Sequence, residues 1–483
     1  MNCERRVKRF KETTGYVLTR WRRPCASAVA LLLPATLVYG GEWQVSPLIS
    51  VAETYTDNVD LAPGDERRDE FITELSPGLS VRGDGRRLDV ALDYVMQNYV
   101  YGRESERNTT AHRLQLGSTT EFVRRHFFVD VNGSLTRQAI SAEDGAFTNR
   151  LDSSNATDVA TWSVSPYLIG RLGRRALAEL RYQYSDIEYD DADALGGVTR
   201  KVSFNAMDSA HADAPSWRVS YSREDIDYDN DTEAKFESIE MVVGWPLAHN
   251  VQLLGTFGYE DNVFTQTESE SDPEGSLWLV GLRWLPSENT LLEVEGGERY
   301  FGETYSALFT MTRSNLRWEV AYSEENISVL QQQLERSVFG EDARLLPSRL
   351  DFLELSDEVS FVRRAESVLS VDARRHDLAF EIYQELRESR LAGSEERLIG
   401  ANVRDRWRVT SLSSVLTSLR SQRQKFLERS RVDEIYELSV GLRRDLGRHA
   451  SASITYEHNR RSSNEDESDY EENALIGRWS ARF

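Results

Sequence analysis

Apolar and polar residues alternate along most of the chain beyond residue 42. In the segment 87–94, apolar residues occupy positions 88, 90, 92 and 94, while Asp89 and Asp93 fall between them. A period of two is typical of a β-strand with one apolar face, and it recurs at 217–222, 251–260, 292–295 and 450–457. Helical spacing is confined to Ser328–Leu346, with Glu381–Ala392 a weaker candidate. The pattern therefore predicts an all-β protein.

Short polar turns alternate with long acidic connections between these strands. Short turns are expected at 83–86, 123–126, 170–174, 212–215, 246–250, 286–289, 314–315, 364–366, 406–409 and 445–448. Longer connections are expected at 56–69, 102–110, 141–154, 190–199, 265–275, 325–348 and 461–471. This arrangement gives about 22 strands (roughly 20–24), with both chain ends on the short-turn side, as in bacterial outer-membrane barrels. The predicted fold is a transmembrane antiparallel β-barrel.

The polar faces of the strands distinguish this barrel from a soluble sandwich or propeller, which also uses many alternating strands. The predicted strands run for about 10 to 15 residues, longer than is usual in soluble sheets. Their polar faces are too charged to form a core, so apolar faces are expected to meet lipid. The lumen is then lined by charged residues, among them Asp89, Asp93, Glu179, Arg181, Glu293 and Glu295, and this explains a mean hydropathy of −0.53. Lumen charges of both signs, such as Arg181 with Glu179 and Arg443 with Glu437, are expected to form salt bridges along the wall rather than a selectivity filter.

The first 41 residues are typical of a secretory leader. Eight Lys or Arg residues precede an apolar run at 26–38, and Gly40 and Gly41 follow it. This order predicts a signal peptide at 1–41 and a barrel at 42–483. The alternative is a membrane anchor, but the run is interrupted by Pro34 and is shorter than the roughly 20 residues that a spanning helix needs.

The end of the chain resembles a closing strand of an outer-membrane barrel. Residues 475–483 alternate, and the outward positions include Trp479 and the terminal Phe483. Such a strand is expected to be recognised by the barrel-insertion machinery. Tyr and Trp near other strand ends, including Tyr99, Tyr101 and Tyr189, fit interfacial girdles that contact outer-membrane lipid.

The composition and motifs argue against several other functions. The net charge is −22, from 58 Lys and Arg against 80 Asp and Glu, so no nucleic-acid partner is expected. The two cysteines, Cys3 and Cys25, lie in the leader, and no phosphate loop or hydrolase motif occurs. We expect no enzyme activity, no cofactor and no dedicated metal site. Acidic runs at 225–231, 268–274 and 465–472 could hold Ca²⁺, although they lack EF-hand spacing.

A motif near the start of the predicted barrel carries a family resemblance. Residues 43–63, which contain Tyr55, Thr56, Asp57 and Asn58, and the segment Phe71–Gly78 resemble outer-membrane β-barrel proteins of PEP-CTERM/exosortase systems and exopolysaccharide loci. The resemblance implies a Gram-negative outer membrane and a link to polysaccharide or protein-sorting genes. The residues alone indicate Asp/Asn turn chemistry where a strand runs into an outer loop, either fixing the first hairpin or contributing to a ligand site.

Two functions remain open from the sequence. One is a porin-like pore for exopolysaccharide or small solutes. The other is a non-conducting structural or surface-interaction barrel that displays acidic extracellular loops. A strand count near 22 suggests comparison with plugged transporters, but the first strand is expected directly after the leader, so no plug domain is expected.

The connection 325–348 is the candidate constriction. It is long for a loop, and Leu330, Leu334 and Phe339 fall on one face of a short amphipathic helix. The helix could fold against the inner wall or lie in an external loop. If it lies inside, deletion of residues 331–344 should raise conductance.

Overall fold

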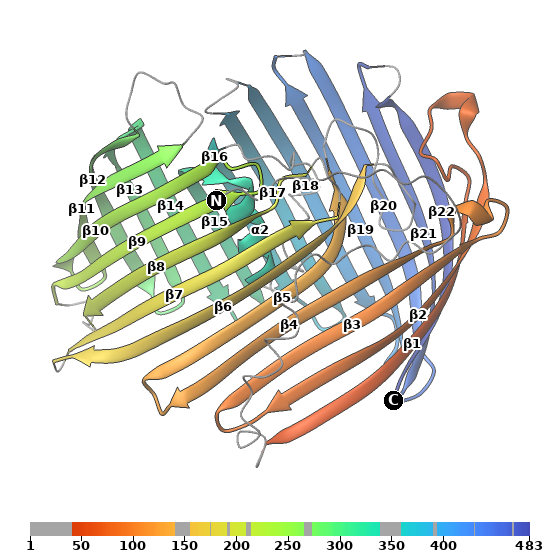
Figure 1. Ribbon diagram of the computed structural model, residues 1–483, viewed down its shortest axis with the longest axis horizontal. Helices are drawn as coiled ribbons and strands as arrows, with labels where there is room; N and C mark the ends of the chain where they lie inside the picture. The colour runs from red at the N-terminus through yellow and green to blue at the C-terminus, as the bar shows by residue number, and fades with distance from the viewer. Residues whose placement is uncertain are drawn as a thin grey trace, which may run out of the picture.

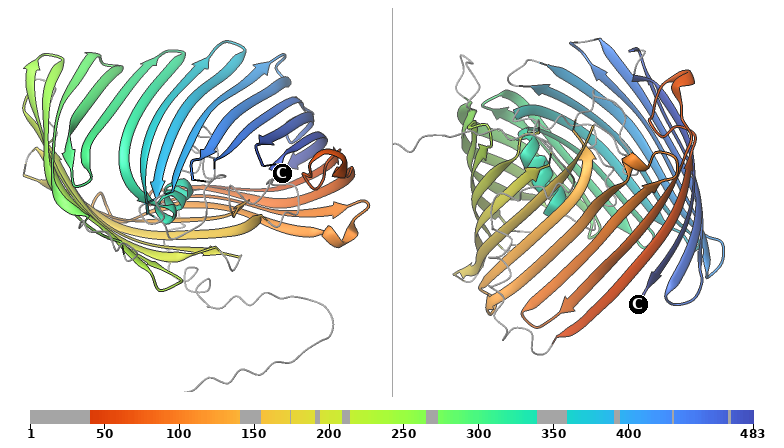
Figure 2. Two further views of the ribbon diagram at one scale, coloured as in Figure 1. Left: turned by 90° about the horizontal axis from the view of Figure 1, so that it is seen from above. Right: turned by 45° about the vertical axis from the view of Figure 1, so that its right-hand side comes forward.

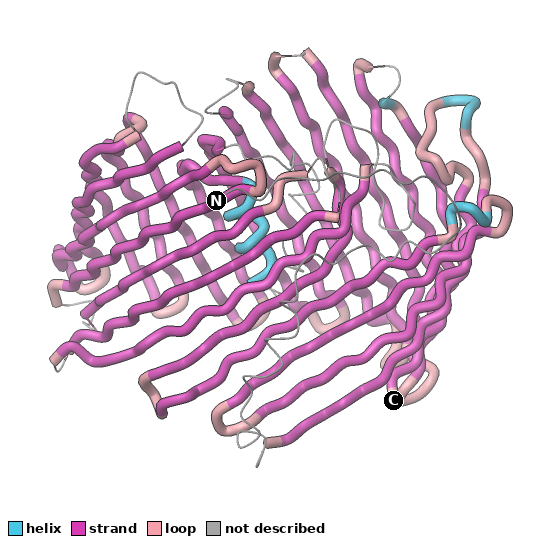
Figure 3. The backbone as a smooth tube through the Cα atoms, in the orientation of Figure 1, coloured by secondary structure: helices cyan, strands magenta, loops and turns pink. Residues whose placement is uncertain are grey.

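The computed structural model describes residues 41–140, 155–173, 175–190, 194–208, 214–264, 273–338, 359–389, 394–428, 430–465 and 468–483. In these residues the chain forms one 22-stranded antiparallel sheet (Figures 1 and 3). Each strand pairs with its neighbours in sequence, and β1 (Glu42–Thr56) also pairs with β22 (Tyr470–Arg482). This last pairing closes the sheet into a barrel, which is flattened in cross-section when viewed from above (Figure 2).

The other strands are β2 (Glu70–Asp84), β3 (Leu88–Tyr101), β4 (Thr109–Val123), β5 (Phe127–Ala139), β6 (Ala156–Leu172), β7 (Ala176–Tyr189), β8 (Gly197–Asp208), β9 (Ser216–Tyr228), β10 (Glu233–Ala248), β11 (Val251–Phe264), β12 (Glu274–Ser287), β13 (Thr290–Arg299), β14 (Gly302–Arg313), β15 (Leu316–Ser328), β16 (Val359–Asp372), β17 (His376–Ser389), β18 (Glu395–Arg408), β19 (Ser413–Phe426), β20 (Arg431–Asp445) and β21 (Ala450–Ser463). Three short helices are described: η1 (Gly64–Glu66), η2 (Ser105–Arg107) and α2 (Val329–Val338). None of these helices is long and apolar enough to cross a bilayer.

The strand number predicted from the sequence is confirmed, but two local predictions are wrong. The segment 364–366, expected to be a turn, lies inside β16, and the turn follows it at 373–375. A polar residue stands at position 364 because this part of β16 faces the lumen, where Arg364 forms an ion pair with Glu385 on the neighbouring strand β17. The weak helical candidate Glu381–Ala392 mostly lies in strand β17, where its polar residues follow a period of two.

Directly paired residues share one face of the sheet, so the register assigns every side chain to a side. Ile187 contacts α2 inside the barrel, and Glu179 and Arg181 therefore face the lumen from the same side of β7. The strand register, followed around the ring, also places Asp93 and Glu293 on the inner face. There Asp93 pairs with Arg82 and Glu293 pairs with Arg283, each at 2.6 Å. The predicted charged lumen is confirmed at these positions.

The outer face is apolar and widely exposed. Trp245, Phe257 and Ile454 have exposed fractions of 59%, 58% and 52%, which is the opposite of a soluble core and suits a surface that meets lipid. Tyr322, midway along β15, and Tyr436, toward the long-loop end of β20, donate hydrogen bonds to the carboxylates of Glu324 and Glu434 on their own strands. These amphipathic tyrosine rings and the carboxylates beside them mark the edge of the apolar band on the side of the long loops.

Three of the tyrosines expected in the outer girdle instead face inward. Tyr99 and Tyr101 are buried with Val59, Leu61, Ile72 and Ala111 where the first long loop packs against the inner face of β2–β4. Tyr189 packs against α2 residues in the lumen. The prediction was wrong because strand ends on both faces carry aromatic residues, and proximity to a strand end does not specify the face.

Candidate functional site

Helix α2 begins directly at the end of strand β15. The Ser328 hydroxyl accepts a hydrogen bond from the Gln331 backbone N–H (3.1 Å), and the Gln331 side-chain oxygen accepts one from the Ser328 N–H (2.8 Å). This reciprocal pair is a capping box, which satisfies two otherwise free donors and fixes the first turn of a helix. The chain is thereby turned from the barrel wall into the lumen (Figure 2).

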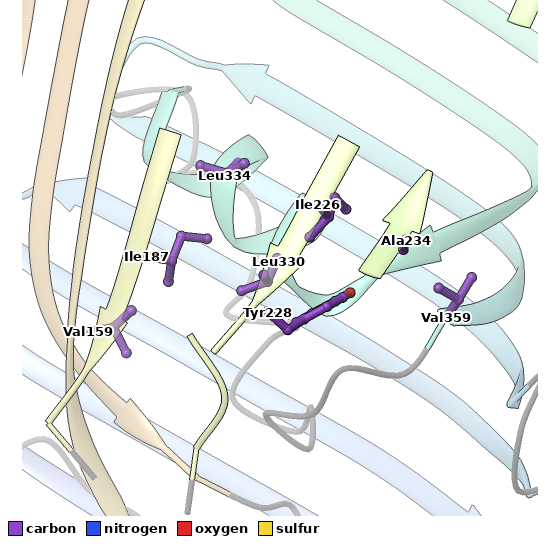
Figure 4. Close-up of a cluster of buried hydrophobic side chains, with 8 residues drawn as sticks. All are labelled: Val159, Ile187, Ile226, Tyr228, Ala234, Leu330, Leu334 and Val359. Atoms are coloured by element: carbon purple, nitrogen blue, oxygen red, sulfur yellow. The ribbon is translucent and has the colours of Figure 1, made fainter. Parts of the chain in front are cut away.

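The apolar face of α2 packs against the inner wall. Leu330 is fully buried and Leu334 is 5% exposed. They meet side chains from four strands of the wall and from the start of β16: Val159, Ile187, Ile226, Tyr228, Ala234 and Val359 (Figure 4). Because the rest of the inner wall is largely polar, this patch matches the apolar face of the helix and holds it in place.

A glycine lets the helix approach the wall closely. A Cβ atom at Gly197 of β8 would lie 3.0 Å from Leu330 Cδ1 and 2.6 Å from the Asp227 carbonyl oxygen. No side chain larger than hydrogen fits there without a shift of backbone or helix. The wall and the helix are therefore complementary in shape as well as in polarity.

Hydrogen bonds hold the polar face of α2 in the same position. Gln331 donates to Glu224 on β9 (3.0 Å), which also pairs with Lys201 on β8 (3.0 Å). Gln333 donates to Gln138 on β5 (3.1 Å). Strands β5 and β15 lie nearly opposite each other in the ring of 22 strands. The helix thus reaches from one side of the lumen to the other.

The sequence singled out Leu330, Leu334 and Phe339 as the constriction. The structure brings Leu330 and Leu334 together on the inner wall, whereas Phe339 lies outside the described residues. Sequence reasoning missed Gln331 and its partner Glu224. The spacing Ser328-x-x-Gln331 was the available signal, since it matches the capping-box pattern.

The lumen wall carries buried ion pairs. Glu385 of β17 lies between Arg364 (2.8 Å) and Arg387 (2.5 Å). Asp433 of β20 accepts from Arg431 (3.1 Å) and Arg461 (2.6 Å). Two guanidinium groups on each carboxylate offset the cost of burying charge. The expected pair of Arg181 with Glu179 is present at 3.0 Å.

One predicted ion pair of the wall is wrong. Arg443 is nearest Asp445 (3.5 Å), and Glu437 pairs instead with Arg420 (3.5 Å). Both partners lie on the inner face, as expected. Which of several facing carboxylates an arginine reaches depends on the stagger between strands, and the sequence does not give that stagger.

Residues Thr56, Asp57 and Asn58 join the first strand and its loop to the last strand. Asp57 accepts hydrogen bonds from the Asn473 backbone N–H (2.7 Å) and side-chain amide (2.8 Å). Asn58 donates to the Glu471 carbonyl (2.9 Å), and Thr56 donates to Glu472 (2.9 Å). We call this set of contacts the seam clasp.

The seam clasp also shapes the first loop. Asn58 is fully buried, and its side chain both donates to the Ala62 carbonyl (2.8 Å) and accepts from the Ala62 N–H (3.0 Å). Tyr55, in contrast, faces outward and packs against Phe71. The motif was expected to fix the first hairpin or hold a ligand; its hydrogen bonds cross the seam between β1 and β22.

The chain terminus lies on the lipid side of the same seam. Trp479 is 41% exposed and pairs in register with Val51, and Phe483 is 68% exposed. The Phe483 N–H donates to the Pro47 carbonyl (2.9 Å). Both aromatic side chains are accessible from outside the barrel.

Among the described ranges, no group of three or more His, Cys, Asp or Glu side chains is placed to hold a metal ion. Of the acidic run 268–274, only residues 273 and 274 lie within those ranges. The run 225–231 forms the end of β9 and its turn, where Asp225 pairs with Arg223 (3.1 Å) and Asp227 with Arg200 (2.5 Å).

A closed antiparallel barrel with an apolar exterior and a charged lumen defines an outer-membrane β-barrel, and the outer membrane is where this protein resides. No family model matches the sequence, and no curated protein is significantly similar to it.

Solved structures share the fold at low identity. The FrpB iron transporter from Neisseria meningitidis (F3-3 variant) matches with a TM-score of 0.53 and 10% identity, over 91% of this chain and 81% of that chain. The siderophore receptor PirA from Acinetobacter baumannii matches with a TM-score of 0.50 and 7% identity, over 91% and 80%. At these identities the likeness establishes the fold alone.

Proposed function

We propose that this barrel is a pore for polar solutes and that α2 narrows its lumen. The observation that carries the proposal is the position of α2: an apolar stripe and two glutamines hold it across the inner wall. A charged inner wall elsewhere suits water and polar solutes. An internal segment that narrows such a lumen would set the size of what passes.

The biological setting is a second part of the proposal. The motif at Tyr55–Asn58 and the segments around it resemble barrels of exopolysaccharide and PEP-CTERM/exosortase systems. On that basis we place the pore in a cell-envelope system that exports polysaccharide or sorts proteins. Deleting the gene and measuring secreted polysaccharide tests this part independently, and unchanged secretion would contradict it.

A non-conducting barrel is the competing function, and one observation favours it. The first loop covers the inner face of β2–β4 through Val59 and Leu61, and α2 covers the adjacent face of β5–β10. Two inward segments on neighbouring parts of the wall could close the lumen. Such a barrel would act through its long acidic loops instead.

Liposome swelling separates the two functions. Vesicles that contain the refolded full chain are diluted into iso-osmotic sugars of increasing size. A narrowed pore should admit monosaccharides quickly and larger oligosaccharides progressively more slowly. Swelling no faster than that of empty vesicles, with protein that is heat-modifiable on a gel, would contradict the pore.

A further inference from the structure

Arginine side chains form a row across the inner wall near the short turns. The register links Arg408 (β18), Ser414 (β19), Arg443 (β20), Ser453 (β21) and Arg478 (β22) as direct cross-strand partners. Directly paired residues lie on one face of the sheet, so all five face the lumen. With strands about 4.8 Å apart, the arginines recur roughly every 10 Å along the row.

Two more arginines extend this row on the same face. Arg406 lies two residues from Arg408, and Arg482 lies four residues from Arg478. We call the five arginines Arg406, Arg408, Arg443, Arg478 and Arg482 the arginine strip. The strip stands out in a chain whose net charge is −22.

The small residues between the arginines leave the guanidinium groups open to the lumen. Ser414 and Ser453 cannot cover their neighbours, and the side chains of Arg408, Arg443 and Arg478 are 46%, 52% and 40% exposed. A guanidinium group that keeps free N–H donors can bind carboxylate or phosphate oxygens in a bidentate manner.

Carboxylates neutralise only part of the strip. Arg408 pairs with Asp377 (2.6 Å) and Asp372 (3.4 Å), Arg478 pairs with Glu74 (2.8 Å), and Arg443 approaches Asp445 at 3.5 Å. Arg482 donates to the Ser80 hydroxyl (2.8 Å). Within the described part of the chain, Arg406 and Arg482 make no ion pair with a carboxylate. In the described ranges, four carboxylates thus pair with the strip, and its five arginines exceed them by one positive charge.

We propose that the arginine strip binds solutes that carry several anionic groups, such as oligophosphates or acidic oligosaccharides, at the short-turn mouth of the lumen. The inference deepens the proposed pore by naming the class of solute, and it rests on that function for its biological role. Guanidinium groups spaced along a wall suit an extended polyanion better than a single small ion, because several weak contacts then act together.

Calorimetry on the full chain refolded in neutral detergent tests the proposal, with sodium tripolyphosphate as the probe. The double variant Arg406→Gln/Arg482→Gln should weaken binding at least about five-fold, with the effect shrinking as salt is added. Arg444→Gln is the matched control, because Arg444 is exposed on the outer face of β20, next to Arg443. It should leave the affinity unchanged.

Several results would overturn the proposal. Undetectable tripolyphosphate binding to the unmodified chain would do so, as would equal loss of affinity in the double variant and the control. Block of conductance from the short-turn side of a planar bilayer supplies the second measurement. Binding without conductance would refute the pore and leave the arginine strip standing; conductance without binding would refute the strip alone.

Discussion

Replacing Asn58 by Ala tests whether the seam clasp closes the barrel. The fully buried Asn58 side chain makes three hydrogen bonds to backbone groups: to the Ala62 carbonyl, from the Ala62 N–H, and to the Glu471 carbonyl. The substitution leaves these groups without that partner. Each buried polar group that loses its partner costs about 1–3 kcal/mol.

We expect a loss of about 3 kcal/mol in the free energy of unfolding, which lowers the folding equilibrium constant roughly 100-fold. The assay is urea-induced unfolding of the refolded protein in lipid vesicles, followed by tryptophan fluorescence. The folded, heat-modifiable form should also disappear from a gel at a lower temperature than in the unmodified chain, because the hydrogen bonds across the seam close the ring.

Asn464→Ala is the matched control for this experiment. Asn464 also bonds to backbone groups, donating to the Ser430 carbonyl (2.7 Å) and accepting from the Val432 N–H (2.8 Å), but it is exposed in the turn that follows β21. Its loss should cost under about 1 kcal/mol, since water replaces the partner. Equal destabilisation by the two substitutions would refute the claim that the motif acts at the seam.

Three further predictions concern the lumen. Ser328→Ala removes one half of the capping box and should weaken the start of α2 by about 1 kcal/mol, seen as faster proteolysis after β15, whereas unchanged cleavage would argue against the box. Gly197→Ala should displace α2, because the new Cβ atom would lie 3.0 Å from Leu330 Cδ1. The distance between spin labels on α2 and β6 should therefore change, and an unchanged distance would refute this prediction. Glu385→Gln leaves Arg364 and Arg387 without their shared carboxylate and should lower the free energy of unfolding by about 3–5 kcal/mol. The control Glu388→Gln should have a small effect, because its partner Arg363 is 43% exposed. Equal urea midpoints for the two variants would contradict this prediction.

The barrel could be predicted from the sequence because its main determinant is local. Strict alternation at positions such as 88–94 fixes the strand and its two faces, and turn chemistry fixes where most strands end. The turn predictions failed where the same polar pattern can arise either from a turn or from a strand that faces the lumen. Arg364 and Glu366 resembled a turn, yet they line the lumen of an uninterrupted strand.

The candidate site was only partly predictable, since its geometry depends on residues far apart in the chain. The apolar stripe of Leu330 and Leu334 indicated a buried helix but not the wall that buries it. The match with Ile187, Ile226 and Gly197 depends on the curvature of the closed ring. Similarly, nothing near Asp57 in sequence indicates Asn473, which the ring closure brings within 2.7 Å.

Single-channel conductance of the Leu330→Asp variant tests the central claim most directly. A carboxylate at this fully buried position would lack a partner on the apolar patch, so α2 should leave the wall. The control is Leu446→Asp, the same change in an exposed turn between β20 and β21. The account predicts a larger conductance for Leu330→Asp than for the control and the unmodified chain; equal conductance in correctly folded, heat-modifiable protein would show that α2 does not narrow the pore.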